Sequence, residues 1–419
     1  MELVSKVSTG KVIGADWVSS PQRIWLRRAL FQVHLWIGIV LAAYAIVIGL
    51  SGSALVFRDE MQHAMWPAVY HITPVERTIT MQGAVDAIQV ARPGWVVFAL
   101  RDFNTHGQAT TALMRPKAGR LSANYRQVSF NPYTGEVLVD RLRYGGWLGW
   151  LANLHEYLLA GSVGLVLSGW MAVGLLVLCI TGVVLWWPGI KRWRSALVVN
   201  PRARWKRLNW ELHSVVGFWT CAVLIVVTFT GLDFAFPDVI GSVVEIATGG
   251  GFSAPSAQSA PTKRAQSPSR FPVMNIDQAI ARVRLALPRE APAGYLQLPA
   301  TLAEGAQYKA TGYYSASLPY SELVRIAIDA RTGAVLSYGD TRKESRGSRI
   351  EQYFTTVHFG SFGGDGLLGL LIKWVWVLVG IAPALLAVTG LIMYWNRKLR
   401  PSWLRMQRDK SSSHLKIVA

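Results

Sequence analysis

Four long apolar runs dominate the pattern of hydrophobic and polar positions along the chain. Each run exceeds the roughly 20 helical residues that cross a bilayer core. The pattern therefore predicts four transmembrane helices, at Leu30 to Phe57, Val163 to Trp187, Val215 to Phe236 and Leu367 to Trp395. The first run follows a basic flank like that of a signal peptide. Because it is far longer than the roughly 7–15 apolar residues of a signal peptide, we interpret it as a retained anchor.

The polar stretches between the apolar runs predict a small α+β domain in each half of the chain. Each stretch has a helical segment, Met81 to Ala91 or Ile276 to Leu287, followed by β-branched and aromatic runs. Val128 to Phe130 and Val324 to Ile328 lead into Thr-Gly turns, where glycine suits a positive φ, and a second short strand follows each turn. Residues 249–272 are rich in Gly, Ser, Ala and Pro and predict a flexible linker.

The chain is accordingly expected to divide into nine segments. They are an N-terminal segment 1–29, a first helix 30–57, a first α+β domain 58–146, an interfacial segment with the second helix 147–187, a loop 188–210, a third helix 211–236, a linker with the second α+β domain 237–349, an interfacial segment with the fourth helix 350–395, and a tail 396–419. The fold class is that of a membrane α-helical protein with a four-helix bundle.

Positive charge is concentrated beside the helix ends. The chain has 43 Lys+Arg against 24 Asp+Glu, a net charge of +19, and 16 of the excess charges lie in segments 1–29, 188–210 and 396–419. Cytoplasmic loops carry such an excess. Both termini are therefore expected in the cytoplasm, with 58–162 and 237–366 on the outer side of the membrane. Because the charge follows the helix ends, the pattern argues for the lipid bilayer as a partner and against nucleic acid.

The two halves of the chain repeat one another. In the first and third apolar runs a histidine is followed 18 residues later by the glycine of a Ser/Thr-Gly step, His34 by Gly52 and His213 by Gly231. The second and fourth runs end in matching Thr-Gly steps, and the polar stretches carry matching Thr-Gly turns. We interpret the chain as an internal duplication of helix, outside domain and helix, with the Ser/Thr-Gly steps of the helices as packing points.

Four histidines recur in this duplicated pattern. His34 and His213 lie near the starts of the first and third helices, which places them near the cytoplasmic side. His155 and His358 precede the second and fourth helices, which places them near the outer side. Ionisable residues in a membrane are costly and indicate function, so we expect two histidine pairs, one at each face.

Facing histidines on a helical bundle are typical of a b-type haem held through two axial nitrogens. Two haem b groups are therefore the predicted cofactors, with His34 and His213 binding the cytoplasmic-side iron and His155 and His358 binding the periplasmic-side iron. The two cysteines, Cys179 and Cys221, form no CxxC motif that would attach a haem covalently. Zinc is the competing interpretation, but two nitrogens at each face are too few for a closed zinc site.

The remaining candidate residues have simpler interpretations. Glu156 is a candidate to orient its neighbour His155. We interpret the other four histidines as surface residues: His63, His71, His106 and His414. Basic residues near the outer helix ends are candidate partners of haem propionates or of an anionic substrate, or else interfacial anchors; they are Arg58, Arg141, Arg143, Arg349 and Lys373.

At these residues the sequence resembles the PepSY-associated transmembrane family, which includes iron-regulated inner-membrane proteins and ferrioxamine-type siderophore reductases. The resemblance covers nearly the whole chain and rests on the segments Ser51-Gly52-Ser53-Ala-Leu-Val-Phe and Trp210-Glu-Leu-His213, the Leu154-His155 and Val357-His358 steps, and the two Thr-Gly hairpins. It implies four helices with extracytoplasmic PepSY domains, and haem ligation by His34 with His213 and His155 with His358. The Phe-Gly-Ser-Phe context after His358 departs from the leucine-rich family pattern.

Three functions from different classes fit these patterns. The leading hypothesis is a haem-dependent transmembrane ferric reductase, an enzyme that passes electrons from the cytoplasmic side to a ferric siderophore or another periplasmic ferric substrate and releases Fe(II). The alternative is a non-enzymatic PepSY sensor or protease-modulating membrane protein. A transporter is the third, although its inverted repeats differ from the parallel duplication here. The electron donor is expected to be a cytoplasmic flavoprotein reductase or a quinol.

Overall fold

The computed structural model describes residues 25–105, 107–118, 124–249, 272–300, 305–315, 322–364 and 366–407. His106, His414 and most of the predicted linker 249–272 lie outside the described residues. The chain separates into two compact units. We call them the helical unit, formed by residues 1–53, 170–229 and 377–419, and the sheet unit, formed by residues 54–169 and 230–376.

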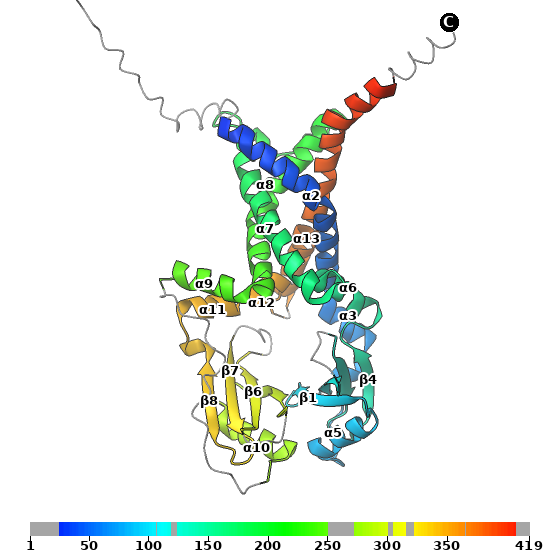
Figure 1. The fold of residues 1–419 in the computed structure, drawn as a ribbon, viewed down its shortest axis with the longest axis vertical. Coiled ribbons are helices and arrows are strands. Elements are labelled where there is room, and N and C mark those ends of the chain that lie inside the picture. The colour runs from blue at the N-terminus through cyan, green and yellow to red at the C-terminus, as the bar shows by residue number, and fades with distance from the viewer. Residues whose placement is uncertain are drawn as a thin grey trace, which may run out of the picture. The chain divides into compact units, whose positions relative to one another are not determined.

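Within the described residues, four helices are long and apolar enough to cross a membrane (Figure 1). They are α2 (Trp25–Leu55), α7 (Gly161–Trp186), α8 (Trp205–Ala235) and α13 (Leu367–Tyr394), which continues through the π-helical turn η4 (Trp395–Leu399). All four predicted helices are present. Helix α8 begins ten residues before the expected Val215, since an ion pair of 2.8 Å between Arg207 and Glu211 supports its polar first turns.

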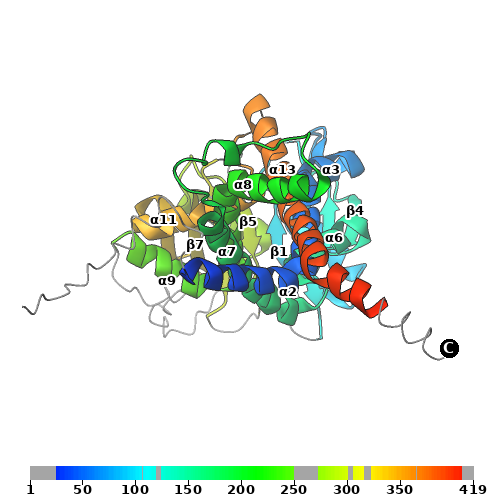
Figure 2. The ribbon, with the colours of Figure 1, turned by 90° about the horizontal axis from the view of Figure 1, so that it is seen from above.

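Small residues let α2 and α13 approach closely within the helical unit (Figure 2). Ser53 Oγ donates a hydrogen bond of 3.0 Å to the carbonyl of Val377, and a Cβ placed on Gly49 would lie 2.5 Å from the carbonyl oxygen of Gly380. Only glycine fits at such a contact. At the end of α7, Arg27 donates a hydrogen bond of 2.9 Å to the carbonyl of Trp187.

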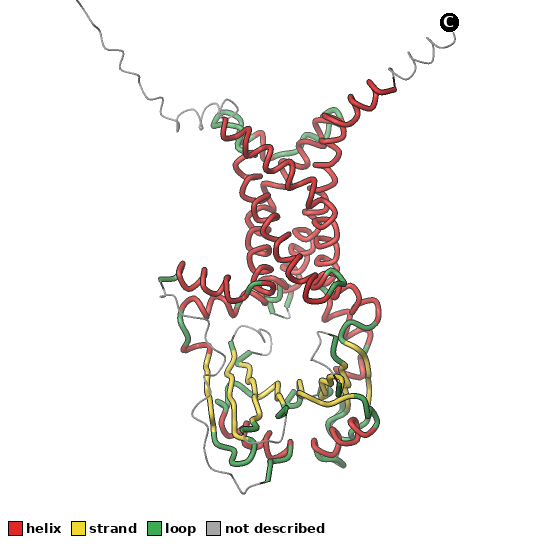
Figure 3. Tube along the Cα trace, in the orientation of Figure 1, coloured by secondary structure: helices red, strands yellow, loops and turns green. Residues whose placement is uncertain are grey.

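The strands belong to the sheet unit (Figure 3). In the described part of the chain they form one eight-stranded antiparallel sheet in the order β4-β3-β2-β1-β5-β6-β7-β8. The first half supplies β1 (Trp95–Arg101), β2 (Thr110–Pro116), β3 (Arg126–Phe130) and β4 (Val137–Leu142), and the second half supplies β5 (Ala293–Gln297), β6 (Gln307–Tyr313), β7 (Leu323–Asp329) and β8 (Val335–Asp340).

The two halves share this sheet, whereas the sequence predicted a small domain in each half. Strand β1 pairs with β5, with Arg101 opposite Tyr295 and Ala99 opposite Gln297. A physical reason is that each four-stranded half would otherwise leave β1 or β5 as an open edge of unpaired backbone groups. Pairing β1 with β5 satisfies the backbone N–H and C=O groups of both edges.

Helices α5 (Met81–Val90) and α10 (Ile276–Ala286) cover one face of the sheet, and their extents match the predicted helical segments. A single apolar core joins them to both halves of the sheet, and its fully buried side chains include Ile88, Phe130, Val283 and Ile328. The Thr-Gly turns are present as predicted, with Gly135 at φ 77° and Gly333 at φ 71°. A side chain other than glycine would be strained there.

The two covering helices also cap each other. The carboxylate of Asp277, in the first turn of α10, accepts hydrogen bonds of 2.9 Å from the backbone N–H groups of Met81 and Gln82. In return, the side chain of Gln82 accepts one of 3.0 Å from the backbone N–H of Ile276. Each helix start therefore has N–H groups satisfied by the other half of the chain.

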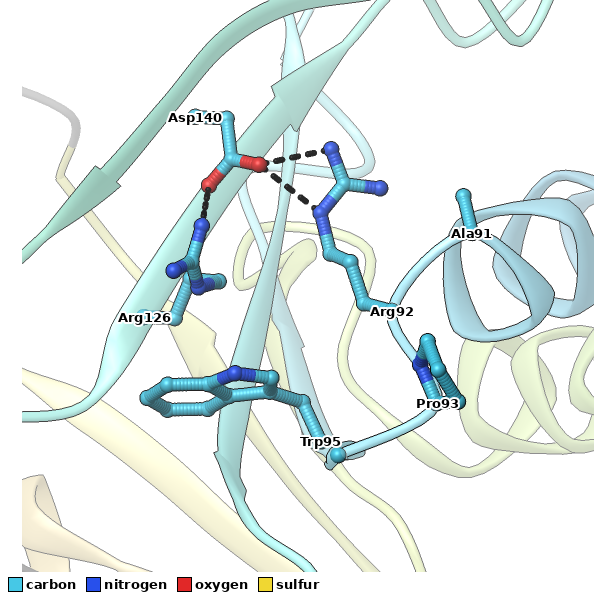
Figure 4. Close-up of a pocket in the computed structure, with 7 residues that line it drawn as sticks. Ala91, Arg92, Pro93, Trp95, Arg126 and Asp140 are labelled. Atoms are coloured by element: carbon cyan, nitrogen blue, oxygen red, sulfur yellow. Dashed lines mark hydrogen bonds and ion pairs between the residues drawn. The ribbon is translucent and has the colours of Figure 1, made fainter.

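An ion-pair network joins the end of α5 to the first half of the sheet (Figure 4). Asp140 on β4 lies between Arg92, at 2.7 Å, and Arg126, at 2.6 Å. The guanidinium of Arg126 also lies over the ring of Trp95, 4.8 Å from its centre. One carboxylate on β4 thus binds two arginines, Arg92 after α5 and Arg126 on β3.

Short helices complete the sheet unit. Helices α3 (Arg58–Met65) and α4 (Pro67–Tyr70) follow α2, α6 (Gly146–Tyr157) precedes α7, and α9 (Pro237–Ala247) follows α8. The turn η3 (Thr341–Lys343) leads to α11 (Arg346–Gln352) and α12 (Phe354–Phe359), which precede α13, and η2 (Ser195–Leu197) lies in the loop of the helical unit.

Replacing Asp277 by Ala should loosen the junction between the two halves. The change removes two charge-assisted hydrogen bonds from the start of α5, so backbone hydrogen exchange over residues 81–90 should accelerate by about tenfold. Exchange is measured by mass spectrometry on the full chain in detergent. The control with the same charge change is Glu290→Ala, because Glu290 is exposed in the turn after α10 and does not belong to the cap. Equal exchange in the two variants would contradict the role of the cap.

Candidate functional site

His34 on α2 and His213 on α8 face each other in the helical unit. Their ring centroids are 6.3 Å apart, and the ring planes are nearly perpendicular, at 84°. His34 is the tenth residue of α2 and His213 the ninth of α8, so both lie inside their helices. The structure therefore brings together the first predicted pair.

Each of these two rings is hydrogen-bonded to a threonine on another long helix. Nδ1 of His34 lies 2.9 Å from Oγ1 of Thr181 on α7, and Nδ1 of His213 lies 2.9 Å from Oγ1 of Thr389 on α13. Each threonine hydroxyl donates its own proton to a carbonyl one turn back, Val177 at 2.7 Å or Leu385 at 2.7 Å.

These bonds determine the protonation of the imidazoles. A hydroxyl that has donated its proton can only accept, so the hydrogen bond from the ring must be Nδ1–H donating to threonine. The neutral imidazole then carries its lone pair on Nε2. In this tautomer Nε2 of His34 and of His213 could each bind a metal, while Nδ1 is satisfied by the protein.

A glycine follows each threonine and leaves space for the ring. A Cβ on Gly182 would lie 3.4 Å from Cε1 of His34, and a Cβ on Gly390 would lie 3.5 Å from Cε1 of His213. A longer side chain at either position would collide with the imidazole. The Thr-Gly steps, expected only as packing points, therefore hold the histidines in place.

The second predicted pair forms in the sheet unit. His155 on α6 and His358 on α12 have ring centroids 6.4 Å apart, with ring planes at 52°. Both short helices end in the left-handed conformation, α6 at Leu158 (φ 49°) and α12 at Gly360 (φ 66°). The chain turns at these residues and enters the following long helix.

His358 repeats the pattern of the first pair. Its Nδ1 lies 3.2 Å from Oγ1 of Thr230, and a Cβ on the next residue, Gly231, would lie 3.0 Å from its Cε1. That approach is tighter than nine in ten real Cβ contacts, so a larger residue at this position would push the His358 ring by a few tenths of an ångström. The ring of Phe234 packs edge-on against the imidazole, 5.4 Å away. Thr230-Gly231 is the step of α8 that the repeat analysis aligned with Ser51-Gly52.

Both ring separations fit two imidazoles bound to one metal ion. A metal–nitrogen bond of about 2.0 Å and about 1.1 Å from nitrogen to ring centre place two such centroids about 6.2 Å apart on opposite sides of the metal. The observed 6.3 and 6.4 Å agree with this distance. Among the described residues, no group of three or more His, Cys, Asp or Glu side chains is arranged to hold an ion, so a closed zinc site has no support there.

Glu156 is the centre of an ion-pair network beside the second pair. Its carboxylate accepts a hydrogen bond of 2.5 Å from Tyr144 and forms ion pairs of 3.1 Å with Arg143 and 3.5 Å with Arg58. Burial and the bond to Glu156 raise the pKa of the Tyr144 hydroxyl, so it stays protonated and donates. Two of the predicted basic residues thus share this one carboxylate.

The remaining predicted residues lie apart from the two pairs. His63 and His71 are exposed, as expected, and the ring of His63 stacks on Tyr70. Arg349 is exposed on α11, whereas Lys373 forms an ion pair with Glu60. Arg141 lies over the ring of Trp66.

Sequence reasoning missed the role of the threonines. The signal that could have found them is the recurrence of the Ser/Thr-Gly step on all four helices together with four histidines. Three of these steps, at Thr181, Thr230 and Thr389, each contact one histidine, but spacing within a single helix does not reveal a contact between helices.

The comparisons with known proteins agree with this architecture. No curated protein matches the chain. The sequence profile described as the PepSY-associated TM region matches residues 31–397, which include all four long helices and both halves of the sheet. The chain is therefore a member of the family defined by the PepSY-associated transmembrane region.

Proposed function

We propose that this protein is a dihaem b-type electron-transfer protein of a bacterial inner membrane, and that it reduces a ferric chelate outside the membrane. The observation that carries the proposal is the arrangement of His34 and His213, with ring centroids 6.3 Å apart and each Nδ1 donating to a back-bonded threonine. A haem bound between such imidazoles supplies one-electron redox chemistry without binding a further ligand.

The residues of the chain orient and tune that group. Nδ1–H donation to Thr181 and Thr389 increases the basicity of the coordinating Nε2, which favours the ferric state and lowers the reduction potential. Apolar helices exclude water around the rings. Arg58 and Arg143 near His155 supply positive charge, although Glu156 already neutralises part of it. The second pair, His155 and His358, is proposed as the ligand set closer to the acceptor.

The proposed direction of electron flow follows from charge. The loop 188–210 joins α7 to α8 and exposes all seven of its basic side chains, as cytoplasmic loops do. We place it and both termini in the cytoplasm, and the sheet unit in the periplasm. Reduction of Fe(III) to Fe(II) then consumes one electron on the outer side and releases the metal, because siderophores bind Fe(II) far less tightly.

Replacing His213 by Ala should remove one haem of two. The purified protein should show a Soret band and two haems per chain, and the variant about half of that content, because one axial ligand is lost from a single site. Pyridine haemochrome assay measures the content. The matched control, His71→Ala, removes an exposed histidine and should keep both haems. A wild-type protein without haem would contradict the proposal and favour the sensor alternative.

Replacing Thr389 by Val should raise the reduction potential of one haem. Valine matches threonine in shape but cannot accept from Nδ1–H of His213, so the imidazole becomes a weaker donor and the ferric state is less stabilised. A redox titration followed by visible absorption should show one of two midpoint potentials moving upward. Thr389→Ser keeps the hydroxyl and should keep both potentials. Identical potentials in the valine variant and the wild type would refute the threonine's role.

The exposed basic loop predicts a salt-dependent donor. If an acidic flavoprotein reduces the haem from the cytoplasmic side, raising the ionic strength from about 0.05 to about 0.5 M should slow reduction by about tenfold. Stopped-flow absorption of the protein in nanodiscs measures the rate. Reduction by a quinol analogue in the bilayer is the control and should not depend on salt. A flavoprotein rate that is equally independent of salt would exclude docking on this loop.

A further inference from the structure

A small polar cavity lies in the sheet unit, on the face of β2, β3 and β4 opposite α5. Alternate strand residues point to opposite faces, so Val128 and Phe130 enter the apolar core while Gln127 and Ser129 point into this cavity. Side chains of α3 and α4 cover it. Its volume is about 40 Å³, and neither histidine pair lines it.

Arg141 supplies a positive charge to this cavity. It is half-buried on β4, and its guanidinium lies 4.3 Å from the ring centre of Trp66. Within the described residues it forms no ion pair, whereas Arg101, which also lines the cavity, pairs with Asp102 at 3.0 Å. Burial, and then the positive charges of Arg58 and Arg101, lower the pKa of Arg141. An anion beside it would relieve this repulsion.

The neutral lining also favours an anion. Gln127, directly opposite Arg141 in the sheet, is only 6% exposed, and its amide can donate two hydrogen bonds. The hydrogen-bonded pair of Thr111 and Ser129 lines the same space and keeps one hydroxyl proton to donate. The Tyr70 hydroxyl, which also lines it, donates to Gln62 at 3.4 Å, and the carboxylate of Asp102 in the lining is paired with Arg101. Donors from an arginine, an amide and one hydroxyl match the oxygen atoms of one oxyanion group.

The size of the cavity limits what enters it. About 40 Å³ holds one carboxylate or phosphate group and cannot hold a whole ferric chelate. The rest of a larger ligand has a polar surface to lie on, because the same face of the sheet continues into the second half. Arg101 is paired with Tyr295, Tyr295 with Thr311, and Thr311 with Arg325 across the strands.

We propose that the Arg141 cavity binds one oxyanion group of a soluble ligand, and that this ligand is a ferric chelate with free carboxylates. This inference rests on the proposed function for the role of the iron, because it assigns the substrate of that function to the polycarboxylate class. The anion-binding site itself stands on the geometry of the cavity alone.

The test uses gallium(III) citrate, which carries carboxylates and cannot be reduced as iron is. Binding to the full chain in detergent is measured by isothermal titration calorimetry. Arg141→Gln should weaken binding by about tenfold or more, the loss expected for a charge-assisted hydrogen bond. Arg141→Lys, which keeps the positive charge, should recover part of the lost affinity. Arg289→Gln makes the same charge change on an exposed residue in the turn after α10 and should bind like the wild type.

The outcomes separate this inference from the haem proposal. Binding of gallium citrate that depends on Arg141 supports the inference whether or not haem is present. Binding that is equal in Arg141→Gln and wild type overturns it, as does binding of a neutral gallium hydroxamate with the same affinity. Two further outcomes would overturn the assignment to a chelate. One is Arg141-dependent binding of inorganic phosphate without binding of gallium citrate, and the other is citrate binding that phospholipid abolishes.

Discussion

The hydrogen bond from histidine Nδ1–H to a threonine hydroxyl is the interaction on which the candidate site depends. A buried imidazole must satisfy both nitrogens or bear the cost of an unpaired polar group. Because Thr181 and Thr389 already donate to carbonyls of their own helices, they can only accept. That single constraint sets the tautomer, aims the lone pair of Nε2 and links α2 to α7 and α8 to α13.

This constraint also explains why small residues recur beside the threonines. The hydroxyl reaches the ring only if the two helix backbones are close, and a glycine at the next position allows that approach. Threonine back-bonding is neutral or slightly unfavourable in an ordinary helix. Here the same geometry provides an acceptor for the histidine Nδ1–H between apolar helices.

Sequence patterns predicted the long helices, the two Thr-Gly turns and the pairing of His34 with His213 and of His155 with His358. Each of these features depends on local periodicity or on internal repetition. The patterns did not predict the pairing of β1 with β5, which joins residues nearly two hundred positions apart, such as Arg101 and Tyr295. They also missed the partners of the histidines and the cavity at Arg141. These features arise from contacts between distant segments, and the residues of a single segment carry no sign of them.

The pairing of β1 with β5 has a consequence for biogenesis. Two long helices, α7 and α8, separate the halves in the chain, so β1 is synthesised well before its partner exists. Until then its backbone N–H and C=O groups form an open edge that can pair with another chain. Newly made protein therefore passes through a stage that needs shielding by a chaperone, and truncation after the first half leaves an aggregation-prone fragment.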